Sequence, residues 1–207
     1  MDFLFNSNIL FYIAAYLIGG VPFGMILAKK YAGVNIKESG SKSIGATNVL
    51  RVVKETNPQL AKKLGLATVL LDAFKGTIIL LLAMFFGMST ETLWAIAVLA
   101  VLGHCYSVFL NFEGGKGVAT ALGVFLILIP IPTLIGALIW GFGAKVLKIS
   151  SLSSLLGLLG VVIAATILND GLGIYSNAPL YIIAFIIFYK HIPNLVRLIR
   201  GEEKKVV

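Results

Sequence analysis

The chain has a single cysteine and few charged residues among its 207 residues. One cysteine, Cys105, excludes an internal disulfide bond and a metal site built from several thiolates, so we expect no metal and no cofactor. Charged residues make up 13% of the chain, compared with about 25% in soluble domains, while 58% are hydrophobic and the mean hydropathy is +0.98. This composition predicts an integral membrane protein.

Acidic residues are scarcer than basic ones, nine against 17, which gives a net charge of +8. The basic residues follow apolar segments and the aromatic residues lie inside them. The chain therefore lacks a basic face with stacking aromatics, and we expect no nucleic-acid partner. The first residues lack a basic stretch and a small-residue cleavage site, because Asp2 precedes the apolar run from Ile9. The first apolar segment is therefore predicted to remain as an anchor.

Long apolar segments fill most of the sequence, and the first three approach the ~20 residues that cross a hydrocarbon core. Pro130 and Pro132 divide one apolar stretch into two shorter helices. The sequence predicts an all-α polytopic membrane helix bundle, a single domain over 1–207 with about seven transmembrane helices. The predicted apolar segments are 8–28, 66–88, 92–112, 118–129, 133–147, 152–169 and 178–190.

The distribution of charge predicts how the bundle sits in the membrane. With seven spans, nearly every basic residue falls on one side, and the other side carries only Asp2, Glu91 and Asp170. The positive-inside rule then places the N-terminus outside and the C-terminus in the cytosol. The basic residues on the predicted cytosolic side are Lys29, Lys30, Lys37, Lys42, Arg51, Lys54, Lys62, Lys63, Lys116, Lys145, Lys148, Lys190, Arg197, Arg200, Lys204 and Lys205.

A Gly-Gly-Lys-Gly string, Gly114 to Gly117, lies between two apolar segments. Glycines allow backbone N–H groups to converge on a phosphate, because no Cβ blocks the approach and positive φ is permitted. Lys116 would add a point charge. The same string is also compatible with a purely structural hairpin turn, so its meaning depends on what lies beside it.

The longest polar segment, 29–65, contains a second anion-binding pattern. Its middle, from Ser39 to Asn48, is rich in serine and glycine and is followed by Arg51, whose guanidinium can hold two oxygens at once. A flexible linker would have a similar composition. However, residues 45–53 are too apolar for a solvated linker, and they predict a short helix with Thr47 or Asn48 in its first turn.

Ionisable residues inside apolar segments need partners. Asp72 and Lys75 are three residues apart and share one helix face, where we interpret them as a structural ion pair that supports the site from behind. His104 is interpreted either as a hydrogen-bonded core residue or as a substrate contact. Phe109 and Val196 follow the two histidines at the position where one large acyltransferase class has aspartate, so that catalytic dyad is absent.

The last apolar segment ends in a third polar pattern. Helical spacing places His191, Asn194 and Arg197 on one face, although Pro193 is also compatible with the start of a new helix. The three polar segments, 39–51, 104–117 and 191–203, all fall on the predicted cytosolic side. A bundle can bring them together into a pocket for one water-soluble phosphate compound and one acyl chain.

Three motifs, in this order, resemble those of the PlsY family of bacterial acyl-phosphate:glycerol-3-phosphate acyltransferases. The resemblance covers about residues 19–203. The family usually has Ser-Gly-Asn where this chain has Ser41-Lys42-Ser43, and glycine reaches positive φ more easily than lysine. The motifs are Ser41 to Arg51 with its Gly-Ala-Thr-Asn string, Gly103 to Ala119, and His191-x-x-Asn-x-x-Arg-Leu-x-x-Gly-x-Glu.

The resemblance implies a multi-pass enzyme of the bacterial plasma membrane with its active site at the cytosolic side. It would transfer a fatty acyl group from acyl phosphate to the 1-hydroxyl of sn-glycerol 3-phosphate, giving lysophosphatidic acid and phosphate. By motif matching, the residues expected to contact glycerol 3-phosphate or product are Ser41, Arg51, Lys116, His191 and Asn194. Those expected to shape the acyl-phosphate site are Thr47, Asn48, Gly114, Gly115 and Gly117.

Two hypotheses remain for the proton of the attacking hydroxyl: His191 accepts it, or a substrate phosphate oxygen does. Lys116 and Arg51 are expected to offset the repulsion between two anionic substrates.

The competing function class is a transporter of phosphate or organic anions. A transporter should carry its site near the bilayer midplane with access from both sides, whereas here the polar segments gather on one side. A scaffold protein would leave the glycine and histidine motifs unexplained.

Overall fold

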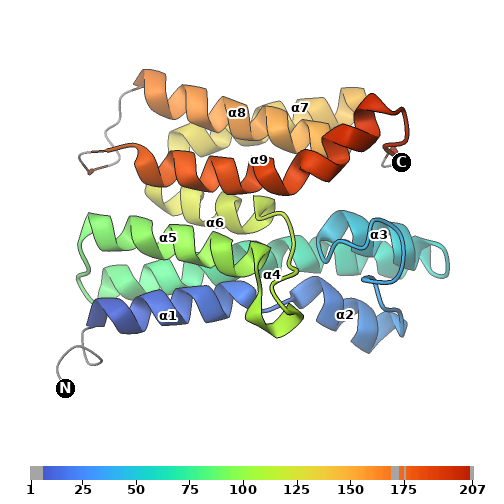
Figure 1. The fold of residues 1–207 in the computed structure, drawn as a ribbon, viewed down its shortest axis with the longest axis horizontal. Coiled ribbons are helices and arrows are strands. Elements are labelled where there is room, and N and C mark those ends of the chain that lie inside the picture. The colour runs from blue at the N-terminus through green and yellow to red at the C-terminus, as the bar shows by residue number, and fades with distance from the viewer. Residues whose placement is uncertain (1–6, 169–172, 175, 206–207) are drawn as a thin grey trace.

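The computed structural model describes residues 7–168, 173–174 and 176–205, and these residues form helices and connecting segments without a β-strand (Figure 1). The all-α prediction is therefore confirmed. The helices are α1 (Ser7–Gly20), α2 (Phe23–Ala32), α3 (Ala46–Lys54), α4 (Pro58–Phe85), α5 (Thr90–Cys105), a short 3₁₀ helix η1 (Val108–Leu110), α6 (Val118–Leu128), α7 (Pro130–Leu147), α8 (Ser150–Leu168) and α9 (Ala178–Ile199).

Six helical segments of the described chain are long and apolar enough to cross a membrane, and α6 is a shorter apolar helix. This agrees with the prediction of about seven spans. The predicted break near Pro130 is confirmed, because α6 ends at Leu128 and Pro130 opens α7. Proline has no backbone N–H, and at the first position of a helix this costs no intrahelical hydrogen bond. Asp2 and Asp170, used to predict the topology, lie outside the described residues, and the orientation of the termini stays a prediction.

The first apolar segment differs from the prediction. Residues 8–28 were expected to form one helix, but the helix is interrupted between Gly20 and Phe23, where Pro22 cannot donate a backbone hydrogen bond. The result is two helices, α1 and α2. The second segment is longer than expected, since α4 begins at Pro58, and its N-cap Asn57 accepts a hydrogen bond from the N–H of Leu60 at 3.0 Å.

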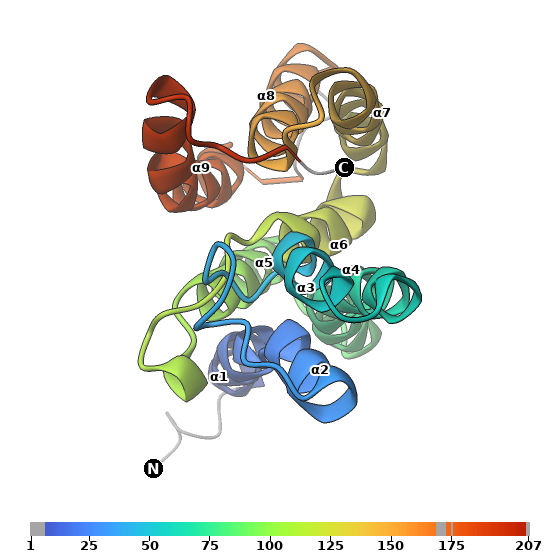
Figure 2. The same cartoon turned by 90° about the vertical axis from the view of Figure 1, so that its right-hand side faces the viewer.

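The helices form two groups with α6 between them. Figure 2 shows α1, α2, α4 and α5 in one group and α7, α8 and α9 in the other. The main core contains the large buried side chains Trp94, Phe125, Leu180 and Ile183, and a smaller core forms where α3 packs on α4. The three polar segments predicted to meet lie toward the same end of the bundle, where Figure 1 also places α3 and the C-terminus.

Glycine allows α1 and α5 to pack with their backbones in contact. A Cβ built on Gly103 of α5 would collide with the carbonyl oxygen of Tyr16, and a Cβ built on Gly19 of α1 would collide with that of Ala100. Lipid chains are as apolar as leucine side chains, so helices in a bilayer associate through such close van der Waals packing. The α1–α5 contact therefore fixes the position of His104 and of the loop that follows α5.

We predict that Gly103→Ala destabilises the protein by about 1–3 kcal/mol, because the new methyl group meets a backbone atom that cannot move aside. Thermal unfolding of the purified protein in detergent measures the effect. Gly141→Ala is the matched control: Gly141 is helical and its Cβ would meet nothing within 4 Å, so alanine should be neutral or stabilising by about 0.5–1 kcal/mol. Equal unfolding temperatures for the two variants would contradict the packing interpretation.

Candidate active site

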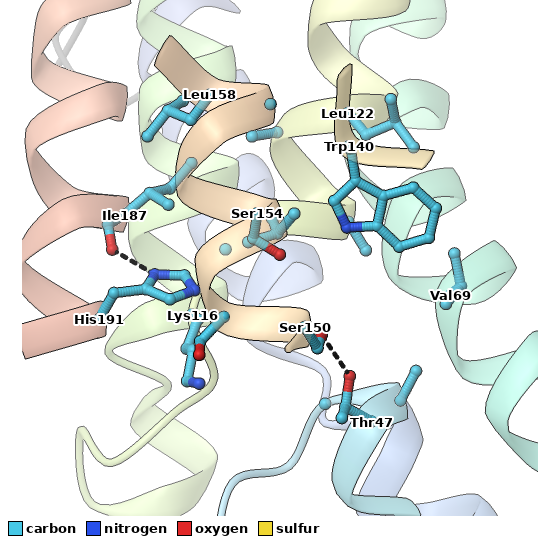
Figure 3. A pocket seen from close by; sticks show the side chains of 18 of the residues that line it. Thr47, Val69, Lys116, Leu122, Trp140, Ser150, Ser154, Leu158, Ile187 and His191 are labelled. Carbon is cyan, nitrogen blue, oxygen red and sulfur yellow. Dashed lines mark hydrogen bonds between the residues drawn. The ribbon is translucent and has the colours of Figure 1, made fainter. Parts of the chain in front are cut away.

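A cavity of about 280 Å³ lies where the three polar segments meet, as Figure 3 shows for part of its lining. Its polar end is lined by Ser41, Ser43, residues 45–48 and Arg51, by Lys116 with Gly117, and by His191 with Asn194, and Glu203 and Lys204 from the C-terminal tail join them. Side chains from α4, α6, α7 and α8 line the remainder. The expectation that these distant segments form one pocket is therefore met.

Asn48 holds the first polar segment in shape. Its side-chain oxygen accepts a hydrogen bond from the N–H of Ser41 at 2.8 Å, and its amide nitrogen donates to the carbonyl oxygens of Ile36 and Ser43 at 2.8 and 2.9 Å. The side chain is 1% exposed, so its amide is fully used inside the loop. Asn48 thus places Ser41 and Ser43 at the cavity through the backbone of the loop.

The predicted short helix after this loop is present as α3. It begins at Ala46, and its N-cap Gly45 supplies no side chain to the free N–H groups of the first turn. Thr47 lies in that turn, and its hydroxyl is 3.0 Å from the hydroxyl of Ser150 at the start of α8 (Figure 3). Arg51 lies one turn further along α3, lines the cavity, and forms no hydrogen bond or ion pair within the described part of the chain. Uncapped N–H groups and a free guanidinium suit an anion.

The start of α8 contributes polar residues that the sequence analysis missed. Ser150, Ser151 and Ser154 all line the cavity. They belong to the string Ser150-Ser-Leu-Ser-Ser154, which opens the predicted segment 152–169, and this cluster of hydroxyls next to Lys148 was a signal that we left out of the prediction. Figure 3 shows Thr47 beside Ser150, with Ser154 one turn further along α8.

Lys116 is the cation nearest the centre of the site. It lines the cavity, and it forms no hydrogen bond or ion pair with any described residue. Burial lowers the pKa of Lys116 to about 8; Glu203 opposes this shift, while Arg197 and Arg51 add to it. The ammonium is therefore only partly compensated by the protein, and an anionic ligand would complete its environment.

The glycines around Lys116 have a different role from the one predicted. The N–H groups of Gly114 and Gly115 donate to the carbonyl oxygens of Cys105 and His104 at 3.1 and 2.9 Å. They are not free to meet an anion, so this part of the prediction is wrong. A Cβ on either residue would collide with His104 or Cys105, so close packing explains why both positions are glycine. Gly117 differs, because its φ of 84° is positive and it is the uncapped N-cap of α6.

A buried polar cluster supports this loop. Lys75 and Asp72 form the predicted ion pair at 2.9 Å, and the ammonium of Lys75 also lies 2.9 Å from the carbonyl oxygen of Val21 and 2.8 Å from Nδ1 of His104. Because an ammonium only donates, Nδ1 of His104 accepts and its hydrogen is on Nε2, the atom that packs against Gly115. His104 is 4% exposed and still lines the cavity, so both of its predicted roles stay open.

His191 presents its other ring nitrogen to the site. Its Nδ1 lies 2.7 Å from the carbonyl oxygen of Ile187, and a carbonyl can only accept, so Nδ1 carries the hydrogen and Nε2 of the neutral ring has a lone pair. Figure 3 shows the ring close to Lys116. The helix α9 runs through Pro193 without a new start, which decides between the two interpretations of that residue.

Glu203 is a further residue that the sequence analysis did not assign to the site. Its carboxylate accepts hydrogen bonds from Asn194 at 2.6 Å, Arg197 at 2.8 Å and Ser151 at 2.8 Å. Burial alone would raise the pKa of Glu203, but these donors together hold it below its usual value. The tail therefore joins α9 to α8, and the predicted alignment of Asn194 with Arg197 is confirmed by their shared acceptor.

The opposite end of the cavity is apolar. Leu122 and Phe125 of α6, Trp140 of α7, and Leu158 and Val161 of α8 line it, and Figure 3 shows Leu122, Trp140 and Leu158 around the upper part of the space. One continuous space thus has a cationic, hydroxyl-rich end and a hydrocarbon end. Such a space can hold an amphiphile with a negatively charged head.

A second concavity of about 290 Å³ adjoins the polar end, and we call it the outer vestibule. It is lined by residues 41–43, 114–116, 189–190, 193–194 and 197, so that Ser41, Ser43, Lys116 and Asn194 border both spaces. Every residue predicted to bind substrate therefore lines one of the two spaces, with Gly114 and Gly115 in the vestibule alone. Within the described residues no group of three or more His, Cys, Asp or Glu side chains is placed to hold a metal ion.

Comparison with known proteins identifies the family. Residues 9–201 match the family described as glycerol-3-phosphate acyltransferase. A glycerol-3-phosphate acyltransferase of Aliarcobacter butzleri is 70% identical and one of Sulfurimonas denitrificans 61% identical, each over the full length of both chains.

Solved structures agree with the sequence relatives. A crystal structure of PlsY, an integral membrane glycerol 3-phosphate acyltransferase, in its glycerol 3-phosphate form matches with a TM-score of 0.81 and 32% identity, covering 97% of this chain and 96% of that one. Its lysophosphatidic acid form matches with a TM-score of 0.79 and 32% identity, covering 97% and 95%. The motif resemblance is thereby confirmed, and the chain belongs to the PlsY family of integral membrane glycerol-3-phosphate acyltransferases.

Proposed function

We propose that this acyltransferase moves a fatty acyl group from acyl phosphate to the 1-hydroxyl of sn-glycerol 3-phosphate, producing lysophosphatidic acid and inorganic phosphate. The observation that carries the proposal is the continuous cavity with Lys116 and Arg51 at one end and Phe125 and Trp140 at the other. A fatty acyl phosphate has the same division into a charged head and a hydrocarbon chain. A transporter is not favoured, because the chain belongs to a family of acyltransferases.

The positive charge of the site fits two phosphate-bearing substrates. Lys116 and Arg51 lack partners in the described chain, and the uncapped first turns of α3 and α6 line the same cavity. Backbone donors at helix N-termini and basic side chains both stabilise phosphate, especially where water is partly excluded. These groups offset the repulsion between the two anions and hold the reacting atoms together.

In the proposed reaction the 1-hydroxyl oxygen attacks the acyl carbonyl carbon, a carbon–oxygen bond forms, and the bond from that carbon to the phosphate oxygen breaks. Phosphate departs with the bonding electrons and needs little acid assistance, since it is a stable anion. We assign the hydroxyl proton to Nε2 of His191, whose Nδ1–H donates to the carbonyl oxygen of Ile187. Ser41 and Asn194 are assigned to orienting glycerol 3-phosphate, and Thr47, Asn48 and Gly117 to shaping the acyl-phosphate site.

The proposed location of the reaction is the cytosolic face of the bacterial plasma membrane. Support comes from the basic residues around the site and from the positive-inside rule, which places the segments carrying Lys42, Lys116, Lys148 and Lys190 in the cytosol. A site at that face gives glycerol 3-phosphate access from water. The hydrocarbon end of the cavity lies between membrane-spanning helices, where a fatty acyl chain has apolar surroundings.

The donor is tested by supplying the purified protein with labelled glycerol 3-phosphate and one of three donors: acyl phosphate, acyl-CoA or acyl carrier protein. We expect lysophosphatidic acid only with acyl phosphate. Turnover restricted to acyl-CoA would overturn the donor assignment. If the protein shows a cooperative thermal unfolding transition, and is therefore folded, but turns over with none of the three donors, the proposed reaction itself is overturned.

The charge of Lys116 predicts a pH dependence. With the pKa of Lys116 lowered to about 8 by burial, the free enzyme carries the ammonium below pH 8 and loses it above, so kcat/KM should fall as the pH rises through about 8. Lys116→Arg should shift this fall to higher pH, because guanidinium keeps its proton. Lys116→Ala should lose activity by orders of magnitude. A modest loss in the alanine variant, or a pH profile unchanged in the arginine variant, would remove Lys116 from the centre of the site.

The assignment of the proton acceptor predicts that His191→Gln lowers kcat by about 10²- to 10⁴-fold, the usual contribution of a general base. Glutamine keeps a hydrogen-bonding side chain of similar size, so KM for glycerol 3-phosphate should change much less. Steady-state kinetics over pH 5–9 measures both quantities. Near-normal turnover with a flat pH profile would assign the proton to a substrate phosphate oxygen instead.

A further inference from the structure

All charged residues that line the outer vestibule are basic. Lys42, Lys116, Lys190 and Arg197 line it, and none of its lining residues is acidic. The nearest carboxylates already have partners: Glu113 pairs with Lys37 at 3.0 Å, and Glu203 accepts from Asn194 and Arg197. The charge of Arg197 is therefore compensated by Glu203, but Lys42, Lys116 and Lys190 form no ion pair with a described residue, and a space of this kind raises the local concentration of anions.

Lys42 has an unfavourable backbone conformation. Its φ is 57°, a left-handed value that a Cβ disfavours, and its N–H closes a tight turn by donating to the carbonyl oxygen of Ser39 at 3.1 Å. Glycine would satisfy this backbone at lower cost. The lysine places a positive charge where glycine would fit the backbone, and Lys42 lines the vestibule.

Two contacts lie at the border of the vestibule. The Lys37–Glu113 pair joins the loop that carries Lys42 to the loop that carries Gly114 and Lys116. The ammonium of Lys190 lies 4.7 Å from the centroid of the Tyr106 ring, a cation–π contact between the two side chains. The vestibule and the main cavity share Ser41, Ser43, Lys116 and Asn194, so an anion held in the vestibule is already next to the reacting site.

We propose that the outer vestibule is a docking site for a phosphate dianion, in which Lys42 and Lys190 hold the phosphate group before or after it contacts Lys116. Two sources supply this chemistry in the proposed reaction: the phosphate of incoming glycerol 3-phosphate and the departing inorganic phosphate. The docking site rests on the proposed function for its ligands. Lys42 and Lys190 act on binding, because neither lines the main cavity in which the acyl transfer is placed.

The test compares Lys42→Gly with Lys42→Arg and with Lys148→Gly in the full-length protein. Lys148 is the matched control: its φ is also 57°, it is exposed, and it lines neither space, so glycine changes the same charge and the same backbone there. Glycine suits the backbone at both positions, so a loss of affinity in Lys42→Gly is not a loss of folding.

We expect Lys42→Gly to raise KM for glycerol 3-phosphate or the inhibition constant of inorganic phosphate by about three- to tenfold, with kcat within about twofold, since the lost Coulomb attraction acts on association. The dependence of kcat/KM on salt should also become shallower. Lys42→Arg should restore the wild-type values and Lys148→Gly should match them. A change in KM identifies incoming substrate as the ligand, and a change confined to phosphate inhibition identifies the departing product.

If Lys42→Gly and Lys148→Gly have the same KM for glycerol 3-phosphate and the same inhibition constant for inorganic phosphate, the docking site is overturned. Equilibrium dialysis of labelled glycerol 3-phosphate without any acyl donor gives a second measurement that does not need turnover. If Lys42→Gly binds this label more weakly than wild type does, but wild-type protein transfers no acyl group, the proposed reaction fails and the docking site stands. If wild-type protein turns over and loss of Lys42 leaves both binding and salt dependence unchanged, the docking site alone fails.

Discussion

The ammonium of Lys75 connects the elements on which the site depends. It lies within 2.9 Å of the carbonyl oxygen of Val21, the carboxylate of Asp72 and Nδ1 of His104. A charge inside an apolar bundle is stable only if several partners replace water, so the break between α1 and α2, the middle of α4 and the end of α5 must stay together. His104 then carries this constraint to Gly115, and Gly115 to its neighbour Lys116.

The fold was largely predictable, because membrane helices are signalled by long apolar runs and by proline. The break at Pro130 followed from its missing donor, and the short helix α3 followed from apolar residues inside a polar segment. The break at Pro22 was missed, since the apolar run continues through Gly19, Gly20 and Val21 and composition alone does not show where a helix bends. At that break the carbonyl oxygen of Val21 accepts from Lys75 as well as from the N–H of Phe23.

The site was predictable in its residues but less so in their roles. Local motifs identified Ser41, Lys116 and His191 as candidates, whereas the hydrogen bonds of Asn48, Gly114 and Gly115 depend on segments folding back on themselves, which no local pattern encodes. Ser150 and Ser151 escaped attention because hydroxyl residues are common at helix starts. Glu203 escaped because its three donors come from α8 and α9, and only the folded chain brings them to one carboxylate.

The three hydrogen bonds of Glu203 also bear on when the enzyme is complete during its synthesis. The site draws on residues from Ser41 near the beginning of the chain to Glu203 near its end, and the carboxylate of Glu203 is what links α8 to α9 beside Lys116. A nascent chain lacks that link until Glu203 itself has left the ribosome. The helices can enter the bilayer one after another, but the site is finished only after all of them and the segment that carries Glu203 have been made.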